Sequence, residues 1–210
     1  MSGNQRRGGD SSALHLGVVD HLGWAIVVAA SPDATVVDRR RIELIEPGLP
    51  AAPVHHLGGL HELHRTGEPL SDDELRAVIA TVRASAAAVI EQGLDQLGLD
   101  LQRPIASLSL RSWPDDFPTD LPTQRRAPWE ARADPVMYRT ALAEAARTRG
   151  WRIRTFETKA IEADALRALG RTDDEILRLP RAALGPPWTK DHRVALAATV
   201  AASPLVPRSG

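Results

Sequence analysis

The first quarter of the chain is dominated by three consecutive runs of β-branched and apolar residues that are joined by very short turns. The runs are Leu16–Asp20, Trp24–Ala30 and Val36–Ile45, with Gly23 and Ser31–Asp33 as turn residues between them. This spacing predicts a meander of three strands. The third run carries charged residues, which is typical of an edge strand that is protected against pairing with another chain.

After residue 70 the pattern changes to alternating helices and strands. Ser71 and Glu74 form a capping box before a run of apolar residues at helical spacing, which predicts a helix over 71–93. Further strands are expected at about Ile105–Arg111 and 151–157. A second helix is expected to begin at the cap Asp134 and to end at Gly150, and further helices are expected at about 159–169, 173–183 and 189–202. The order β-β-β-α-β-α-β-α(α)-α predicts an α/β fold with a mixed five-stranded sheet and helices on both faces.

Length and composition predict one soluble domain. We expect it to span 13–203, between a disordered tail at 1–12 and a flexible tail at 204–210, whose ending "LVPRSG" is similar to a protease-cleavage tag. The absence of cysteine excludes disulfides and thiolate chemistry, and the sequence predicts neither a signal peptide nor a membrane partner, hence a cytoplasmic protein. A net charge of −1 limits any nucleic-acid contact to a local patch.

The stretch "KDHRVALAATVAA" combines small residues with a polar beginning. Its alanines predict a helix that lies close against the sheet, which would hold Asp191, His192 and Arg193 over the strand ends. A helix N-terminus attracts anions, and Lys190 adds to that attraction. Asp191 is equally explained by the favourable interaction of an acid with the helix dipole.

The succession of elements, together with two short motifs, resembles the ribonuclease H-like superfamily, nearest to its RuvC-type Holliday junction resolvases. The motifs are "LGVVDHLGWAIVV", in which Asp20 takes a metal-ligand position, and "KDHRVALAATVAA", in which Asp191 takes an acidic ligand position beside His192. The likeness covers roughly 14–202. The ending "GPPWTKDHR" is also similar to that of an uncharacterised group of actinobacterial proteins, which implies no function.

This resemblance implies a divergent metal-dependent nuclease or phosphodiesterase acting on nucleic acid, with Mg²⁺ or Mn²⁺ held by Asp20 and Asp191. Two of the usual four carboxylates are replaced, one in the strand "IASLSLRS", which offers Arg111, and one at Val194. Two metal ions need about three or four acidic ligands, so the remaining pair suits a single ion. The alternative is a catalytically silent module that binds nucleic acid, a nucleotide or a protein partner; the oligomeric state is left open.

Other side chains complete the candidate site. Among the catalytic candidates, His55 or His56 is expected to act as a general base from the long connection after the third strand, and His61 with His64 offers a weaker metal pair. Arg111, Lys159 and Arg193 are expected to contact phosphate, while Asp115, Asp116 and Glu157 are candidates for a third carboxylate. Two purely structural alternatives stay open. Asp20 is equally explained as a turn residue, and Trp113 as a residue that anchors its loop rather than one that stacks on a base.

Overall fold

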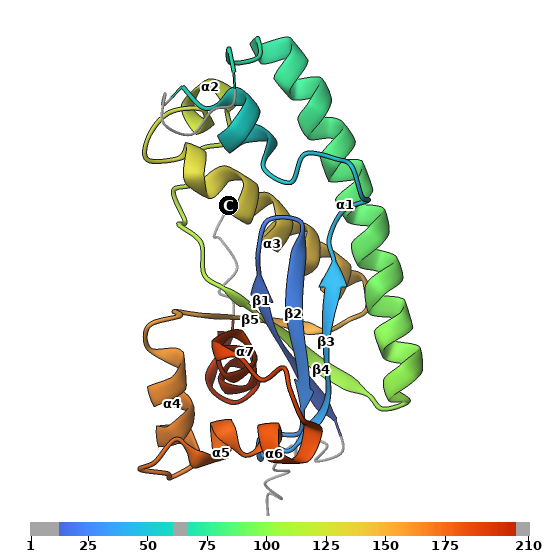
Figure 1. Cartoon of the computed structure of the whole chain (residues 1–210), viewed down its shortest axis with the longest axis vertical. Helices are drawn as coiled ribbons and strands as arrows, with labels where there is room; N and C mark the ends of the chain where they lie inside the picture. Colours follow the sequence, from blue (N-terminus) through green and yellow to red (C-terminus); the bar gives the residue numbers. More distant parts are fainter. Residues whose placement is uncertain (1–12, 61–66, 205–210) are drawn as a thin grey trace, which may run out of the picture.

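One mixed sheet forms the centre of the protein, whose computed structural model describes residues 13–60 and 67–204 (Figure 1). The strands are β1 (Leu14–Asp20), β2 (Trp24–Ala30), β3 (Val36–Glu43), β4 (Ile105–Arg111), β5 (Arg152–Phe156) and β6 (Ser203–Pro204). Their order in the sheet is β3-β2-β1-β4-β5-β6. β1 pairs with β2 in antiparallel and with β4 in parallel orientation, so the predicted mixed five-strand sheet is confirmed and β6 adds a short antiparallel edge. The predictions for 1–12 and 205–210 lie outside the described residues.

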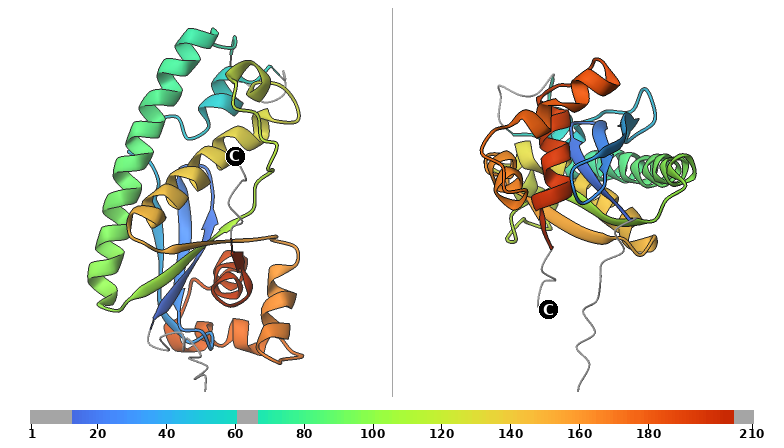
Figure 2. Two further views of the ribbon diagram at one scale, coloured as in Figure 1. Left: turned by 180° about the vertical axis from the view of Figure 1, so that it is seen from behind. Right: turned by 90° about the horizontal axis from the view of Figure 1, so that it is seen from below.

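Helices cover both faces of this sheet, as the two views of Figure 2 show. The longer ones are α1 (Asp72–Leu101), α3 (Glu130–Thr148), α4 (Ile161–Ala168) and α7 (Lys190–Ala201). The shorter ones are a π-helical segment η1 (Pro53–Gly58), α2 (Leu121–Gln124), α5 (Glu175–Arg178) and α6 (Pro180–Leu184). α1 and α3 pack on one face, and α7, with α4 beside it, packs on the other.

Three helix boundaries differ from the sequence-based prediction. α1 begins at the predicted capping box but continues to Leu101, because neither Gly93 nor Gly98 stops a helix whose buried face is already docked. α3 begins at Glu130, so Asp134 lies inside the helix and is not its N-cap. The expected helix at 173–183 is broken into α5 and α6 at a proline, which cannot donate a backbone hydrogen bond.

Strand alternation divides the core into two layers. In β1, Leu16 and Val18 belong to the apolar cluster beneath α1 and α3, whereas Val19 belongs to the cluster beneath α7. Since successive side chains of a strand point to opposite faces, alternate residues of β1 contact alternate helical layers. The same alternation decides which layer each polar residue at the strand end can reach.

The docking of α7 on β1 is very close. A Cβ atom added to Gly17 would lie 1.8 Å from the carbonyl oxygen of Ala195, so only glycine allows the helix backbone to approach this strand. Ala195, Ala197 and Ala198 are fully buried. The predicted tight contact of an alanine-rich terminal helix with the sheet is therefore confirmed.

α1 is the one helix among the described residues that is long and apolar enough, by length and composition, to cross a membrane. Its inward residues Val82, Ala86, Ile90 and Leu94 are fully buried in the core against the sheet and α3. A helix with one such buried face fits the core of a globular domain.

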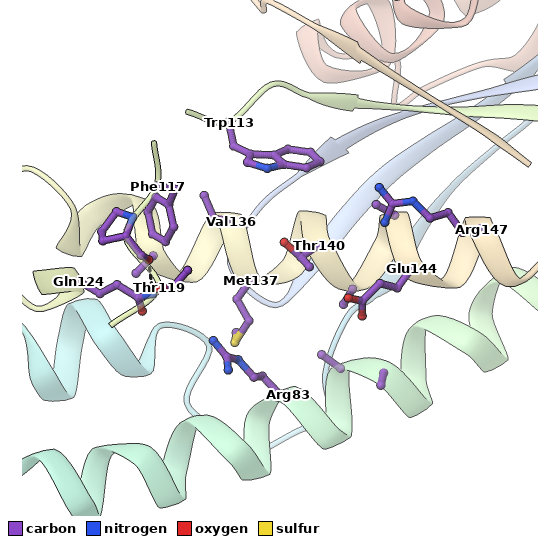
Figure 3. Close-up of a pocket in the computed structure, with 16 residues that line it drawn as sticks. Arg83, Trp113, Phe117, Thr119, Gln124, Val136, Met137, Thr140, Glu144 and Arg147 are labelled. Carbon is purple, nitrogen blue, oxygen red and sulfur yellow. Dashed lines mark hydrogen bonds between the residues drawn. The ribbon is translucent and has the colours of Figure 1, made fainter. Parts of the chain in front are cut away.

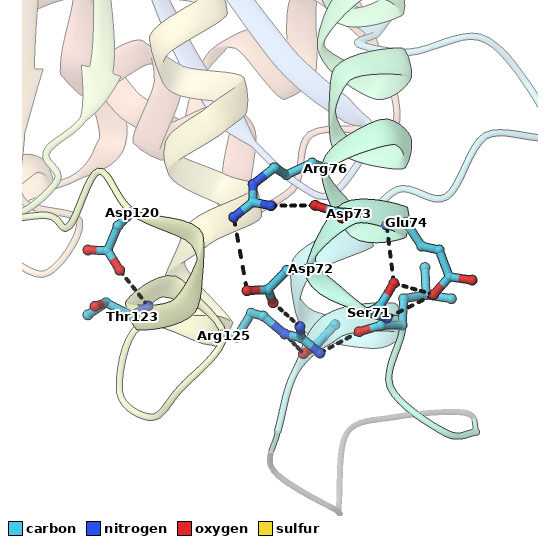
Figure 4. A network of polar contacts seen from close by, with 10 residues as sticks. Ser71, Asp72, Asp73, Glu74, Arg76, Asp120, Thr123 and Arg125 are labelled. Atoms are coloured by element: carbon cyan, nitrogen blue, oxygen red, sulfur yellow. Dashed lines mark hydrogen bonds and ion pairs between the residues drawn. The ribbon is translucent and has the colours of Figure 1, made fainter.

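The connection between β3 and α1 is fastened by Arg125. Its guanidinium group donates to the backbone oxygens of Gly58 and Leu70 at 2.7 and 2.6 Å, and it pairs with Asp72 in the first turn of α1. Figure 4 shows this network beside the capping box of Ser71 and Glu74. The arginine thus fixes the position of η1 relative to the start of α1.

Candidate functional site

Asp20, at the end of β1, is buried and held by arginines. Its side chain is 2% exposed, and Oδ2 accepts a hydrogen bond of 2.9 Å from Nε of Arg139 in α3. Arg139 also donates to the backbone oxygen of Ser112 at 3.1 Å. Nε of Arg111, which ends β4, lies 4.0 Å from Oδ1 of Asp20. The carboxylate therefore lies between two guanidinium groups, an arrangement called the clamp below. Arg139 of α3 bonds Oδ2, whereas Oδ1 and the Nε atom of Arg111 are buried without a hydrogen-bond partner in the described part of the chain.

Asp191 has a different partner. It lies in the first turn of α7, where its Oδ2 is 3.0 Å from Nε2 of His21. The His21 ring is stacked on Trp24 with ring centres 4.0 Å apart. The contact connects the start of α7 to the turn between β1 and β2.

The two acids that were expected to converge are bound on different sides of the sheet. Asp20 follows the alternation of Leu16 and Val18 and is engaged from α3, whereas Asp191 lies in the first turn of α7. Figure 2 shows α3 and α7 on opposite faces of the sheet. The prediction that Asp20 and Asp191 share one metal ion is therefore not supported by this geometry. Its physical reason is strand parity, which turns the Asp20 side chain away from α7.

The donor set does not fit the Mg²⁺ or Mn²⁺ ion that was expected at these acids. Hard divalent cations need several oxygen ligands, and two arginines already neutralise Asp20 while His21 engages Asp191. Within 13–60 and 67–204, no group of three or more histidine, aspartate or glutamate side chains is arranged to hold a metal. No step that depends on a metal can be derived from this arrangement.

His192 acts as a helix cap. Its side chain is nearly buried, and Nδ1 accepts a hydrogen bond of 3.1 Å from the backbone N–H of Thr189 and lies 2.8 Å from the Thr189 hydroxyl. The ring packs on Trp188 at 5.3 Å. Burial, together with the charge of Arg39, lowers the pKa of His192, so the neutral ring that the cap requires is favoured. The catalytic role predicted for His192 has no support in this geometry.

The histidines of the long connection lie elsewhere. His55 and His56 belong to η1, which packs against α1 and α3 and not against α7. These histidines lie in the helical layer opposite that of Asp191, and the general-base role of His55 or His56 stays a prediction. His61 and His64 lie outside the described residues.

Asp134 is the polar residue that fixes η1. Fully buried in α3, it accepts hydrogen bonds from the backbone N–H groups of Val54 at 3.1 Å and His55 at 2.9 Å. Burial raises the pKa of Asp134 to about 7 against the opposing effect of these two hydrogen bonds. This side chain was expected to cap its own helix, and it instead caps a neighbouring one.

The remaining candidates are spread along the strand edge. Arg193 faces Glu162 of α4 at 3.7 Å, and Lys159 is exposed after β5. Glu157 is bonded to the hydroxyl of Ser112, while Asp115 and Asp116 are exposed. None of these three acids supplies a further ligand beside Asp20 among the described residues.

Sequence reasoning missed Arg139 and His21, the two residues that determine the state of the predicted acids. Arg139 is 119 residues from Asp20 in the chain, and no local pattern distinguishes it from the other arginines of the sequence. The signal for His21 was available, since it directly follows the motif aspartate.

No protein-family model and no curated protein matches the sequence. Among solved structures, the chain is similar to that of Thermus thermophilus RuvC, with a TM-score of 0.50, 11% identity, and coverage of 91% of this chain and 99% of that chain. It is also similar to T. thermophilus RuvC in complex with a Holliday junction substrate, with a TM-score of 0.51, 11% identity, and coverage of 92% and 99%.

These likenesses concern the fold. The chain has the ribonuclease H-like architecture of RuvC over nearly its whole described length, as the order of its elements predicted. The identity of 11% transfers no residue role to this chain.

Proposed function

We propose that this protein is a ribonuclease H-like module that binds nucleic acid at the C-terminal edge of its sheet without metal-dependent cleavage. The observation that carries the proposal is the clamp on Asp20, in which Arg139 bonds one carboxylate oxygen and Arg111 faces the other. The position at which the resemblance expects a metal ligand is thus engaged by the protein's own cations.

The electrostatics of the clamp oppose a divalent ion. Arginine stays charged at every accessible pH, so the two guanidinium groups repel a divalent cation under all experimental conditions. The carboxylate is also nearly inaccessible, at 2% exposure. A metal ion at Oδ1, the carboxylate oxygen without a hydrogen bond, would face the guanidinium group of Arg111, whose Nε lies 4.0 Å from that oxygen.

Two exposed lysines at the same edge support nucleic acid as the partner. Lys159 follows β5 and Lys190 begins α7, and neither forms an ion pair with any residue in 13–60 or 67–204. A phosphate backbone is bound by such free cations and by helix N-termini. The structural likeness to RuvC in complex with a Holliday junction adds support for a nucleic-acid partner.

The proposal is tested by fluorescence anisotropy with a labelled four-way DNA junction and a duplex of the same arm sequence. We expect equal affinity in EDTA and in Mg²⁺ at constant ionic strength, and no cleavage product in Mg²⁺ or Mn²⁺ on a denaturing gel. Lys159→Ala combined with Lys190→Ala should weaken binding and reduce the slope of log affinity against log salt by about 2, if each lysine binds one phosphate.

Arg167→Ala serves as the control, because Arg167 is an exposed arginine that pairs with Asp164 near the end of α4 that is farther from Lys159. The observation against the proposal would be metal-dependent cleavage that Asp191→Asn abolishes. That result would establish the nuclease function that the resemblance implies. Failure of the protein to bind either DNA would also refute the proposal.

A further inference from the structure

A groove of about 530 Å³ crosses the outer side of α3 between α1 and the loop that follows β4. Figure 3 shows Thr140, Glu144 and Arg147 along α3, with Trp113 on one side of this helix and Arg83 of α1 on the other. This volume lies within the range of small-molecule sites, about 300–1,000 Å³. The groove does not include Asp20, Lys159 or Lys190, so it is distinct from the strand edge.

The hollow exists because small side chains line it. Ala86 and Ala87 of α1 and Ala133 and Ala141 of α3 leave space where larger residues would fill the gap between the two helices. Larger apolar side chains, among them Trp113, form its walls, and Trp113 itself packs partly buried against the core. Its position is therefore fixed by the fold, which makes the indole a rigid flat surface.

The charges of the groove are unbalanced. Arg83 and Arg147 line it from two helices, and neither forms an ion pair with another residue of the described chain. Glu144 is the acid among the lining residues, so the lining has an excess of one positive charge. Arginine guanidinium groups recognise carboxylates, sulfonates and phosphates through paired N–H donors.

We infer that this groove binds a small organic anion with a flat apolar body. The apolar body lies on the wall and floor made by Trp113, Met137 and the alanines, and the anionic group is held by Arg83 or Arg147. This site extends beyond the proposed nucleic-acid function, because it uses none of the residues invoked for that function.

The inference is tested with a pair of probes that share their aromatic rings. Anilinonaphthalene sulfonate carries an anionic group, and N-phenylnaphthylamine is the same ring system without it. Fluorescence titration of the whole protein should show one site for the sulfonate, with binding about tenfold weaker for the uncharged probe, since one charged hydrogen-bonding contact is lost.

Variants locate the probe in the groove. Ala87→Leu fills the space from an exposed position of α1, so it should abolish binding, whereas Ala88→Leu, also exposed on α1 but outside the lining, should have no effect. The variant that removes the arginine holding the sulfonate, Arg83→Gln or Arg147→Gln, should bind the sulfonate probe about tenfold more weakly. Both variants should bind the uncharged probe with unchanged affinity. Arg167→Gln is the control for loss of a surface charge, and thermal melts confirm that each variant is folded.

Three results would overturn the inference. The first is no saturable binding of the sulfonate, and the second is equal binding by the wild type and Ala87→Leu. The third concerns a second copy of the chain: if light scattering shows a dimer that Ala87→Leu dissociates while Ala88→Leu does not, the groove is an interface between copies. None of these results depends on whether the protein binds DNA, so the two proposals fail separately.

Discussion

The two faces of the sheet are built by different means. The face beneath α7 is closed by small residues, and Gly17 allows the helix backbone to approach the strand. The face beneath α1 and α3 contains charged groups inside or beside the core, of which Asp20 and Asp134 are the most deeply buried. One face therefore depends on steric fit, and the other on the pairing of polar groups.

The difference explains why the candidate site was only partly foreseen. On the α7 face, the residue types themselves indicate the contact. Alanine and glycine have small side chains, so a helix and a strand rich in them can pack closely against each other. On the other face, each buried polar group needs a specific partner from elsewhere in the chain. The function proposed here follows from one such partnership, that of Asp20 with Arg139.

The largest effect is expected from breaking the clamp. Asp20→Ala leaves Arg139 nearly buried without its carboxylate and should lower the free energy of unfolding by about 4 kcal/mol, as measured by urea denaturation. An unchanged free energy of unfolding in Asp20→Ala would contradict the clamp.

A double variant separates the effect of the unpaired charge from the effect of the lost side-chain volume. Asp20→Leu combined with Arg139→Met replaces the hydrogen-bonded ion pair by apolar groups. Part of the lost stability should return, because the more deeply buried arginine is gone and only Arg111, whose side chain is 25% exposed, keeps a charge without its carboxylate. Strictly additive losses from the two single variants would contradict the clamp as the source of the effect.

A smaller but still large effect is expected on the opposite face. Gly17→Ala places a Cβ 1.8 Å from the backbone oxygen of Ala195, so α7 must move away from β1, at a cost of about 3 kcal/mol. The comparison is Gly93→Ala in α1, where nothing lies within 4 Å and the helix should gain about 0.5–1 kcal/mol. If Gly17→Ala and Gly93→Ala changed the free energy of unfolding equally, the close approach of α7 to β1 would not be what stabilises this face.

The fold was predictable from the sequence because its signals are local. Turn residues separated the strands, and the capping box of Ser71 and Glu74 marked the start of α1 correctly. The alternating order of the later elements was enough to predict the mixed sheet. These patterns need no knowledge of which residues meet in space.

The site was not predictable to the same degree. Asp134 followed by Pro135 has the pattern of a helix start, yet α3 begins four residues earlier and the aspartate caps η1 instead. Asp20 was singled out from its motif, but its partner Arg139 lies 119 residues away in the chain. The groove on α3 depends on three segments at once, so no single stretch of sequence indicates it.

The last predicted effect concerns the pH dependence of the polar face, through Asp134. Its pKa is about 7 in the folded protein and about 4 in an unfolded chain, so the folded state binds an extra proton between these values. The contribution of Asp134 to stability is then complete below about pH 4 and is lost as the pH rises through about 7. Urea denaturation should show a loss of roughly 2 kcal/mol between pH 5 and pH 8 that is absent from Asp134→Asn, because asparagine does not titrate. An identical pH dependence of the two proteins would mean that the buried carboxyl group is ionised throughout, and that the two backbone N–H groups of η1 outweigh its burial.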